Sequence, residues 1–317
     1  MIKKWGEKPY YSFSYMLKER FGEKIYKLAL NGGMSCPNRD GTLGHRGCIF
    51  CSMGGSGDFA GNAADSITAQ IESQKQLISQ KRHAGKYIAY FQAYTNTYAP
   101  LPYLERIFTE ALNHPDIAAI SIGTRPDCLD SDIIQMLSCL NAQKPVWVEL
   151  GLQTIHPQTA AYIRRGYDLA CFEQAVSMLR QHNLEVIVHT IIGLPGEGRK
   201  ELLETIDYLN HADIQGIKLQ LLHVLKDTDL ATDYLNGKFE VLTKEDYLQL
   251  VIDCLEHLSP EIVIHRVTGD GPKNLLIAPT WSSAKRSVLN DLHRKMKEKN
   301  AWQGKHYAME ETSWQNL

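Results

Sequence analysis

The stretch NGGMSCPNRDGTLGHRGCIFCSMGGSGDFAG, residues 31–61, holds three cysteines with the spacing C-x11-C-x2-C. These are Cys36, Cys48 and Cys51, and no fourth cysteine lies nearby in the chain. Cysteine thiolates hold iron–sulfur clusters, and a cubane cluster usually takes four of them. Three protein ligands leave one iron open to another ligand, and an open metal position is where catalysis takes place. The stretch therefore predicts a catalytic [4Fe–4S] cluster in a loop that spans residues 33–61.

Two other interpretations of these cysteines stay open on the residues alone. Free cysteines often pack as small hydrophobic residues, but this loop is mostly Gly, Asn, Arg, Asp and Thr. A structural zinc ion would need a fourth Cys or His ligand, and His45 lies between the cysteines and could serve. The remaining cysteines are scattered and are interpreted as core or incidental residues: Cys128, Cys139, Cys171 and Cys254.

The length and composition suit one main domain. The chain has 317 residues, of which 44% are hydrophobic, enough for a single barrel-type core. Seven cysteines, an odd number, favour a reducing compartment over a disulfide framework. No apolar stretch approaches the roughly 18 residues of a membrane span, and the start MIKKWGEKPYYSF lacks the apolar core of a signal peptide. We therefore expect a cytoplasmic protein with no membrane partner.

Short apolar runs rich in β-branched residues alternate with longer amphipathic patterns along the chain. Strands are expected at residues 25–33, 87–93, 117–123, 146–152, 184–193, 214–224 and 261–267. Helices are expected near residues 65–84, 102–113, 130–141, 169–182, 197–210 and 243–257. This alternation predicts parallel strands with helical crossovers, in a sheet covered on both faces. Residues 1–270 would form the barrel domain, and residues 271–317 a helical, basic extension packed on it.

Charge is distributed unevenly, although the formal net charge is only −2. Residues 273–305 carry eight Lys or Arg against two acids, and further lysines lie near the amino terminus. A polyanion can bind such a local patch, while a basic run is also typical of a solvated helix surface. The segment 273–305 is thus a candidate surface for RNA.

Chemically reactive side chains gather at the carboxyl ends of the expected strands. From the first strand to the sixth these are the cysteine loop, QAYTNTY (92–98), GTRPD (123–127), ELGLQ (149–153), HTIIGLPGE (189–197), and the group Lys218, Gln220 and His223. In barrel enzymes this face carries the active site, so we expect these segments to meet there.

These motifs resemble the radical S-adenosylmethionine (SAM) superfamily, over roughly residues 20–270. The usual spacing in that superfamily is C-x3-C-x2-C, and the longer first gap resembles the branch near the Elongator catalytic subunit and the YtqA/YhcC-type proteins. GTRPD, GLQT followed by RRG, GLPGE, LHVLKDTDL and HRVTGDGPKNLLIAPTW look like the YtqA type from end to end. The resemblance implies a partial (β/α)6 TIM barrel with a [4Fe–4S] cluster and SAM as cofactors.

The resemblance also implies an activity. YtqA-type proteins resemble MnmL-type enzymes, which trim a 5-carboxymethylaminomethyl group on the tRNA wobble uridine to 5-aminomethyl. The implied enzyme generates a 5′-deoxyadenosyl radical, with tRNA as partner and an electron donor such as flavodoxin or ferredoxin. A radical SAM enzyme of small molecules, or a noncatalytic Cys-zinc or RNA-binding protein, is the alternative.

Candidate SAM contacts follow from the same resemblance, position by position. Gln153 in GLQ and Arg165 in IRRG resemble a Gln and an Arg that contact SAM in the coproporphyrinogen branch, and a guanidinium can pair with the methionine carboxylate. His189 stands where that branch has an acidic residue, and a core histidine is its alternative interpretation. The usual glycine-rich GGE or GGT segment is missing from the second strand. Thr95 and Asn96 are the candidate acceptors for the methionine amino group.

Candidate substrate contacts come from the charged residues at the strand ends. Glu149 is a candidate for the SAM ribose hydroxyls, and an ion pair with Arg125 is as plausible. A substrate carboxylate needs a cation, and Arg125, Lys218, His223 and Arg266 are available. We rank Lys218 and Arg125 first, because Lys218 interrupts an apolar strand and Arg125 lies in a turn expected to be exposed. His223 completes the set of expected catalytic residues.

Overall fold

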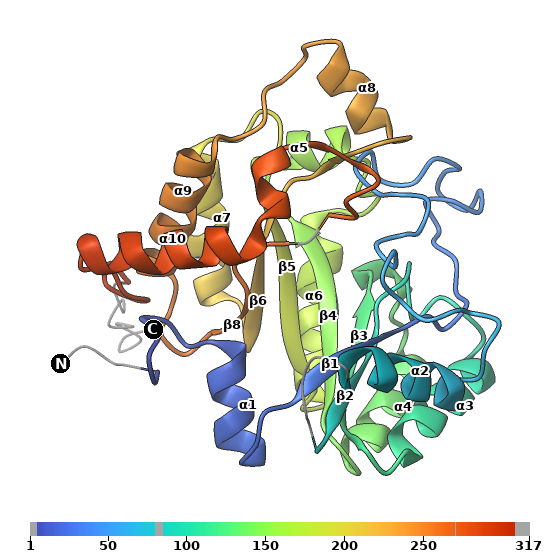
Figure 1. The fold of residues 1–317 in the computed structure, drawn as a ribbon. Coiled ribbons are helices and arrows are strands. Elements are labelled where there is room, and N and C mark those ends of the chain that lie inside the picture. The colour runs from blue at the N-terminus through green and yellow to red at the C-terminus, as the bar shows by residue number, and fades with distance from the viewer. Residues whose placement is uncertain (1–4, 80–84, 270, 308–317) are drawn as a thin grey trace, which may run out of the picture.

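The computed structural model describes residues 5–79, 85–269 and 271–307, and its framework is a parallel β-sheet curled into an open barrel (Figure 1). Seven strands lie in the order β1-β2-β3-β4-β5-β6-β8, and all neighbouring pairs are parallel. Their bounds are β1 Tyr26–Leu30, β2 Tyr87–Phe91, β3 Ile117–Thr124, β4 Val146–Gln153, β5 Glu185–Ile192, β6 Gly216–Leu221 and β8 Val263–Arg266.

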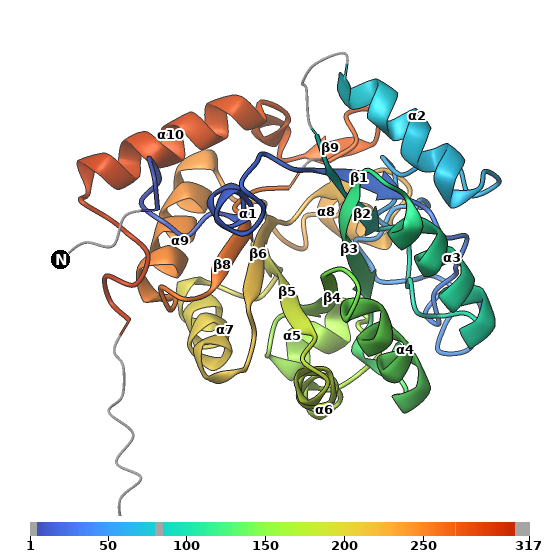
Figure 2. The same cartoon turned by 90° about the horizontal axis from the view of Figure 1, so that it is seen from below.

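Helices cover the outer face of the sheet and form the crossovers between strands (Figure 2). In α3, Leu104, Ile107 and Phe108 are buried at helical spacing, which gives this helix one apolar face toward the sheet. Most of the hydrophobic core lies between such faces and the strands. The crossover helices are α2 Ile67–Ser79, α3 Leu101–Asn113, α4 Ser131–Asn141, α6 Leu169–Gln181, α7 Arg199–His211 and α9 Lys244–His257.

A further helix, α1 Phe13–Phe21, lies in the gap between β8 and β1 and is seen end-on in Figure 2. Just before it, Ser12 forms a parallel bridge with Ile264 of β8. Met16 and Leu17 are buried against residues from the amino-terminal halves of several strands, namely Ile88, Ala119, Trp147, Ile187 and Val263. The helix thus fills the amino-terminal end of the barrel and leaves the carboxyl ends of the strands for the site.

The last part of the chain packs back onto the barrel. Strand β9, Leu276–Ala278, pairs antiparallel with β7, Val224–Leu225. Helix α10, Lys285–Glu298, contacts α9 and buries Val288, Leu292 and Met296. The short elements are η1 Pro126–Cys128, α5 Pro157–Tyr162, α8 Asp229–Leu235 and η2 Thr280–Ser283.

The sequence predicted this framework. Six strand–helix units followed by a seventh strand make the expected partial TIM barrel, with boundaries close to those expected; residues 80–84 of the first expected helix lie outside the described ranges. The sequence did not predict α1, α5, α8 or the β7–β9 pair, because such short elements carry little periodic signal. In the described ranges, no helix combines the length and the apolar character needed to cross a membrane.

Candidate active site at the carboxyl ends of the strands

The cysteine loop connects β1 to α2 without helix or strand, and side chains of its own hold it in place. Asn38 Nδ2 donates to the carbonyl oxygen of Arg164 (2.8 Å) and lies 3.4 Å from Cys48 Sγ. Arg39 Nη2 donates to the carbonyl oxygen of Cys51 (2.9 Å). The polar residues between the cysteines therefore fix the backbone on which the thiols are mounted.

A glycine fastens the far end of the loop to the segment after β2. Gly55 has a φ of +57°, and a Cβ there would lie 2.3 Å from the ring of Tyr94. The Tyr94 hydroxyl donates to the carbonyl oxygen of Met53. Only glycine allows this approach of backbone to ring without a shift.

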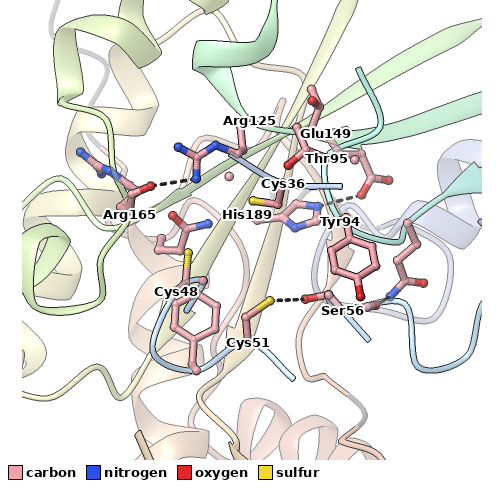
Figure 3. Close-up of a pocket in the computed structure, with 18 of the residues that line it drawn as sticks. Cys36, Cys48, Cys51, Ser56, Tyr94, Thr95, Arg125, Glu149, Arg165 and His189 are labelled. Atoms are coloured by element: carbon pink, nitrogen blue, oxygen red, sulfur yellow. Dashed lines mark hydrogen bonds and ion pairs between the residues drawn. The ribbon is translucent and has the colours of Figure 1, made fainter. Parts of the chain in front are cut away.

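Cys36, Cys48 and Cys51 line one cavity together with side chains from several strand ends (Figure 3). Five of the six expected SAM contacts are on its wall: Thr95, Glu149, Gln153, Arg165 and His189. The sixth, Asn96, is fully buried, and its Nδ2 donates to the carbonyl oxygens of Phe91 (3.1 Å) and Gly123 (2.8 Å). Asn96 thus supports the wall from behind.

The arrangement of the thiols suits a cluster better than a single zinc ion. Zinc–sulfur bonds are about 2.3 Å long, so thiolates on one tetrahedral zinc lie about 4 Å apart. Within the part of the chain that the structure describes, the three Sγ atoms do not all lie within 4.8 Å of one another. His45 is exposed and does not line the cavity. In a cubane each thiolate binds a different iron, so wider spacing is required there, and the residues present fit that group.

Burial controls the protonation of Cys48 and Cys51. It raises the pKa of Cys48 to about 12, and it also raises the pKa of Cys51. Both are therefore thiols near neutral pH in the protein alone. Because ligation requires thiolates, binding of the cluster releases their protons.

Glu149 on β4 has no exposed surface, and its carboxylate accepts four hydrogen bonds. Oε1 accepts from Lys27 Nζ (2.5 Å) and Ser121 Oγ (2.5 Å), while Oε2 accepts from Lys218 Nζ and from His189 Nε2 (2.7 Å). Burial alone would raise the pKa of Glu149, but the charges of Lys218 and Lys27 hold that pKa well below its usual range. Burial, together with Lys218, lowers the pKa of His189 to about 4, so this imidazole is neutral near pH 7.

These four hydrogen bonds change the expected role of Glu149. Four donors fill the four lone-pair sites of a carboxylate, which argues against the expected contact with the SAM ribose. The alternative ion pair with Arg125 is also not formed. Arg125 was expected in an exposed turn, but only 8% of its surface is exposed. Its guanidinium donates two hydrogen bonds to the Asp127 carboxylate (2.9 and 2.7 Å).

Arg165 is held by backbone carbonyls. Its Nη1 donates to Leu152 (3.0 Å) and Thr154 (2.7 Å), and its own carbonyl accepts from Arg125 Nη1 (2.9 Å; Figure 3). The ring of Tyr167 lies 4.9 Å from both guanidinium groups. The RRG segment is therefore locked to the end of β4 before any ligand binds.

Two of the expected catalytic residues do not line the cysteine cavity. Lys218 is 3% exposed and is committed to Glu149 and to the Tyr90 hydroxyl (3.1 Å). His223 lines a neighbouring cavity. The sequence interpretation did not include Lys27 among the site residues. Lys27 carries the same signal that singled out Lys218, because each is a lysine inside an apolar strand.

Another group of ligand-type side chains, Glu72, His114 and Asp116, lies near the start of β3, at the opposite end of the sheet. Lys75 Nζ donates to Glu72 (2.8 Å) and to Asp116 (2.6 Å). The ammonium group already balances these carboxylates, so we interpret the group as a surface ion-pair network.

Fold, loop and cavity together define a class of protein, a partial barrel that presents three cysteines at the carboxyl ends of its strands. The model of the Radical SAM superfamily matches residues 41–209, and that of the Radical_SAM C-terminal domain matches residues 214–298. The chain belongs to the radical SAM superfamily. The cofactors of this superfamily are a [4Fe–4S] cluster and SAM.

Two relatives show which branch of the superfamily this chain resembles. YtqA of Bacillus subtilis is 47% identical over 308 residues, which cover 97% of this chain and 96% of YtqA. YhcC of Escherichia coli K12 is 38% identical over 283 residues, 89% of this chain and 90% of YhcC. The expected likeness to these two proteins is confirmed.

Two more distant similarities are an acetyltransferase and a solved structure. A tRNA uridine(34) acetyltransferase of Methanocaldococcus jannaschii is 27% identical over 190 residues, 57% of this chain and 33% of that protein. The structure of Elp3 from Methanocaldococcus infernus superposes with a TM-score of 0.67 at 15% identity, covering 88% of this chain and 64% of that one. This last likeness shows the shared fold.

Proposed function

We propose that this radical SAM enzyme acts on the wobble uridine of tRNA, trimming a 5-carboxymethylaminomethyl group to 5-aminomethyl. The observation that carries the radical chemistry is the single cavity shared by the three cysteines with Gln153 and Arg165. The similarity to a tRNA uridine(34) acetyltransferase supports tRNA as the substrate. The likeness to MnmL-type enzymes in the sequence motifs suggests the group that is trimmed.

Different residues of the cavity would bind the cluster and orient SAM. When bound, the cluster and SAM supply a 5′-deoxyadenosyl radical that removes a hydrogen atom from the carbon between the nitrogen and the carboxylate of the substrate. Loss of one further electron to the oxidised electron carrier would give an imine, and hydrolysis of its C=N bond would leave the 5-aminomethyl group and release a two-carbon oxo acid. In this proposal Cys36, Cys48 and Cys51 hold the cluster, while the polar groups of Thr95, Gln153 and Arg165 orient SAM. The buried wall keeps water and stray hydrogen donors away from the radical.

Lys218 and Arg125 fit positioning roles better than direct contact with substrate. Lys218 fixes Glu149, which in turn orients His189 on the cavity wall. Arg125 donates to the carbonyl oxygen of Arg165 and so steadies the RRG segment. Both side chains are already paired, which leaves them little capacity for a substrate carboxylate.

The basic segment offers a smaller RNA surface than its composition suggested. Ion pairs neutralise part of it: Lys295 with Glu245, Arg294 with Asp291 (3.1 Å) and Glu298 (3.4 Å), and Lys305 with Glu256 (3.0 Å). On α10 and at its carboxyl end, three exposed cations form no ion pair with any described residue: Arg286, Lys297 and Lys299. We propose that these three contact tRNA phosphates.

A small-molecule substrate is the second candidate, and the partial neutralisation of α10 is the observation that favours it. Either substrate calls for an external one-electron donor such as flavodoxin or ferredoxin. All seven cysteines are free, which supports the proposed reducing, cytoplasmic compartment.

Nucleoside mass spectrometry of bulk tRNA, from cells with and without this gene, tests the proposal. We expect 5-carboxymethylaminomethyluridine or its derivatives to accumulate when the gene is deleted, and 5-aminomethyluridine derivatives to fall. Unchanged wobble uridines would reject the tRNA substrate and leave the small-molecule enzyme.

A further inference from the structure

A second cavity adjoins the cysteine cavity. The two share five wall residues, Phe50, Ser56, Gln92, Gln220 and Arg266. The second cavity has a volume of about 140 Å³, and a cavity of about 150 Å³ accommodates one benzene ring. Its size therefore suits a single six-membered ring next to the position of the cofactors.

The wall of this second cavity combines apolar side chains with polar ones such as Gln92 and Gln220. Phe59 lies on the cavity wall with 53% of its surface exposed, and Ile191 and Leu222 are buried there. The ring of His223 packs against backbone, since a Cβ on Gly269 would lie 3.2 Å from its Cε1 atom. The apolar side chains can pack against the faces of an aromatic ring, while the polar ones can bond to polar groups on its edge.

Arg266, the last residue of β8, brings positive charge to the junction of the two cavities. Its guanidinium is half-buried, and its hydrogen bond is a long one, from Nη1 to Gln220 Oε1 at 3.5 Å. No carboxylate among the described residues lies within 4.0 Å of it. Asp58, on the wall of the second cavity, accepts instead from Ser52 Oγ (2.8 Å).

The other cations on the strands and just beyond their ends already bond to groups of the protein. Lys27 and Lys218 share Glu149, Arg125 holds Asp127, and Arg165 donates to backbone carbonyls. A half-buried guanidinium without a counter-charge is unfavourable by itself and strongly favours an anion from outside. Arg266 is thus the strand-end cation best placed to receive one.

We infer that the second cavity is the substrate subsite of the cysteine cavity, and that Arg266 there binds a carboxylate attached through a short chain to a six-membered ring. The inference rests on the proposed function for the identity of that ring, the uracil base. Binding the carboxylate at the shared wall would hold the adjoining C–H bonds beside the cysteine cavity, where the radical is formed.

A third cavity adjoins this subsite. It shares Asp58, Phe59, Gly271 and Pro272 with the second cavity and has a volume of about 580 Å³. Exposed Lys273 lies on its wall. A base that leaves a polynucleotide could enter by this path, with Lys273 near the backbone phosphates.

Ligand binding to the reconstituted holoenzyme with SAM, and without reductant, tests the inference by saturation-transfer NMR. One pair of probes is 5-carboxymethylaminomethyluridine and 5-aminomethyluridine, and the other is N-benzylglycine and benzylamine. In each pair only the first ligand carries the carboxylate. We expect the wild type to prefer the carboxylate ligand and Arg266→Gln to reduce that affinity roughly tenfold or more. Arg266→Lys should retain part of it, and the control Arg106→Gln, at an exposed position of α3, should retain all of it.

The outcomes separate the two proposals. Arg266-dependent binding of N-benzylglycine, with no binding of either nucleoside, would support the carboxylate site and count against the uridine substrate. Equal binding of the carboxylate ligands by wild type and Arg266→Gln, or binding by neither, would overturn the inference. In that case altered wobble uridines in cells lacking the gene would still support the proposed function. Cluster absorbance and thermal stability of each variant show whether it is folded.

Discussion

At the residue scale, the site depends on one carboxylate that serves two lysines. Glu149 is separated from Lys27 and Lys218 by 122 and 69 positions in the chain, yet both ammonium groups bond to it inside the barrel. Desolvation makes each of these charges costly alone, and their mutual attraction offsets that cost. His189 then receives a fixed orientation from the same carboxylate.

Removing the carboxylate should therefore harm the fold more than removing one lysine. Glu149→Gln leaves two buried ammonium groups without a counter-charge, and we expect the free energy of unfolding to fall by about 4 kcal/mol. Lys218→Met leaves the carboxylate with Lys27 and His189, so its effect should be about half as large. Urea denaturation measures both. A Lys218→Met variant of unchanged stability that fails to bind substrate would instead make Lys218 a direct substrate contact.

The cysteines give the second prediction at this scale. Replacing Cys36, Cys48 or Cys51 singly by Ala should abolish the iron–sulfur absorbance near about 400 nm after anaerobic reconstitution, because each thiolate holds one iron. Cys139→Ala is the matched control, since this exposed thiol lies on α4 away from the cavity. Loss of absorbance in the control would require a different set of ligands.

At the element scale, the cysteine loop has no regular structure and depends on a few contacts of close fit. Gly55→Ala would force a Cβ into the Tyr94 ring, so the loop must shift and the cluster should be retained poorly. Gly237→Ala is the control, because Gly237 also has a positive φ of +70° but its Cβ would meet nothing within 4 Å. Iron content after gel filtration compares the two. Equal iron in both variants would show that the Tyr94 contact does not hold the loop.

Helix α10 gives a prediction about RNA. Arg286 and Lys297 are eleven positions apart, which places them on the same side of the helix, and Lys299 follows its end. Reversing these three charges should weaken tRNA binding and reduce the slope of log K against log salt by up to about 3, as fewer counterions are released. Filter binding across a salt series measures this.

Its control neutralises cations of α10 that are already paired. Arg294→Gln with Lys295→Gln removes two charges that bond to Asp291 and Glu245, so the salt slope should change little. If both sets of variants bind tRNA like the wild type, α10 is a solvated surface and the small-molecule substrate gains support.

At the scale of the whole molecule, the alternation of apolar and amphipathic stretches in the sequence was enough to predict the partial barrel. Strands such as Ile117–Thr124 and Val146–Gln153 read as apolar and β-branched, and amphipathic helices separate them. The position of α1 was not predictable in this way, because its role is to fill a gap that exists only once β8 lies near β1.

The same limit applies to the site. The residue types that reach the cavity could be foreseen from strand ends, but not which of them are already paired. Lys218 and Arg266 look alike in sequence, as cations on neighbouring strands. Only the fold shows that Lys218 bonds to Glu149. Only the fold shows, too, that Arg266 lines a cavity and that no described carboxylate lies within 4.0 Å of it.

The most direct measurement follows both products of one reaction. Reconstituted enzyme, SAM and reductant are incubated with tRNA from cells that lack the gene, and mass spectrometry quantifies 5′-deoxyadenosine together with the wobble nucleosides. We predict that this tRNA stimulates formation of 5′-deoxyadenosine, and that 5-aminomethyluridine appears as its carboxymethylated precursor declines. Production of 5′-deoxyadenosine at the same rate with and without tRNA, and with no change in any wobble nucleoside, would contradict the proposed tRNA activity.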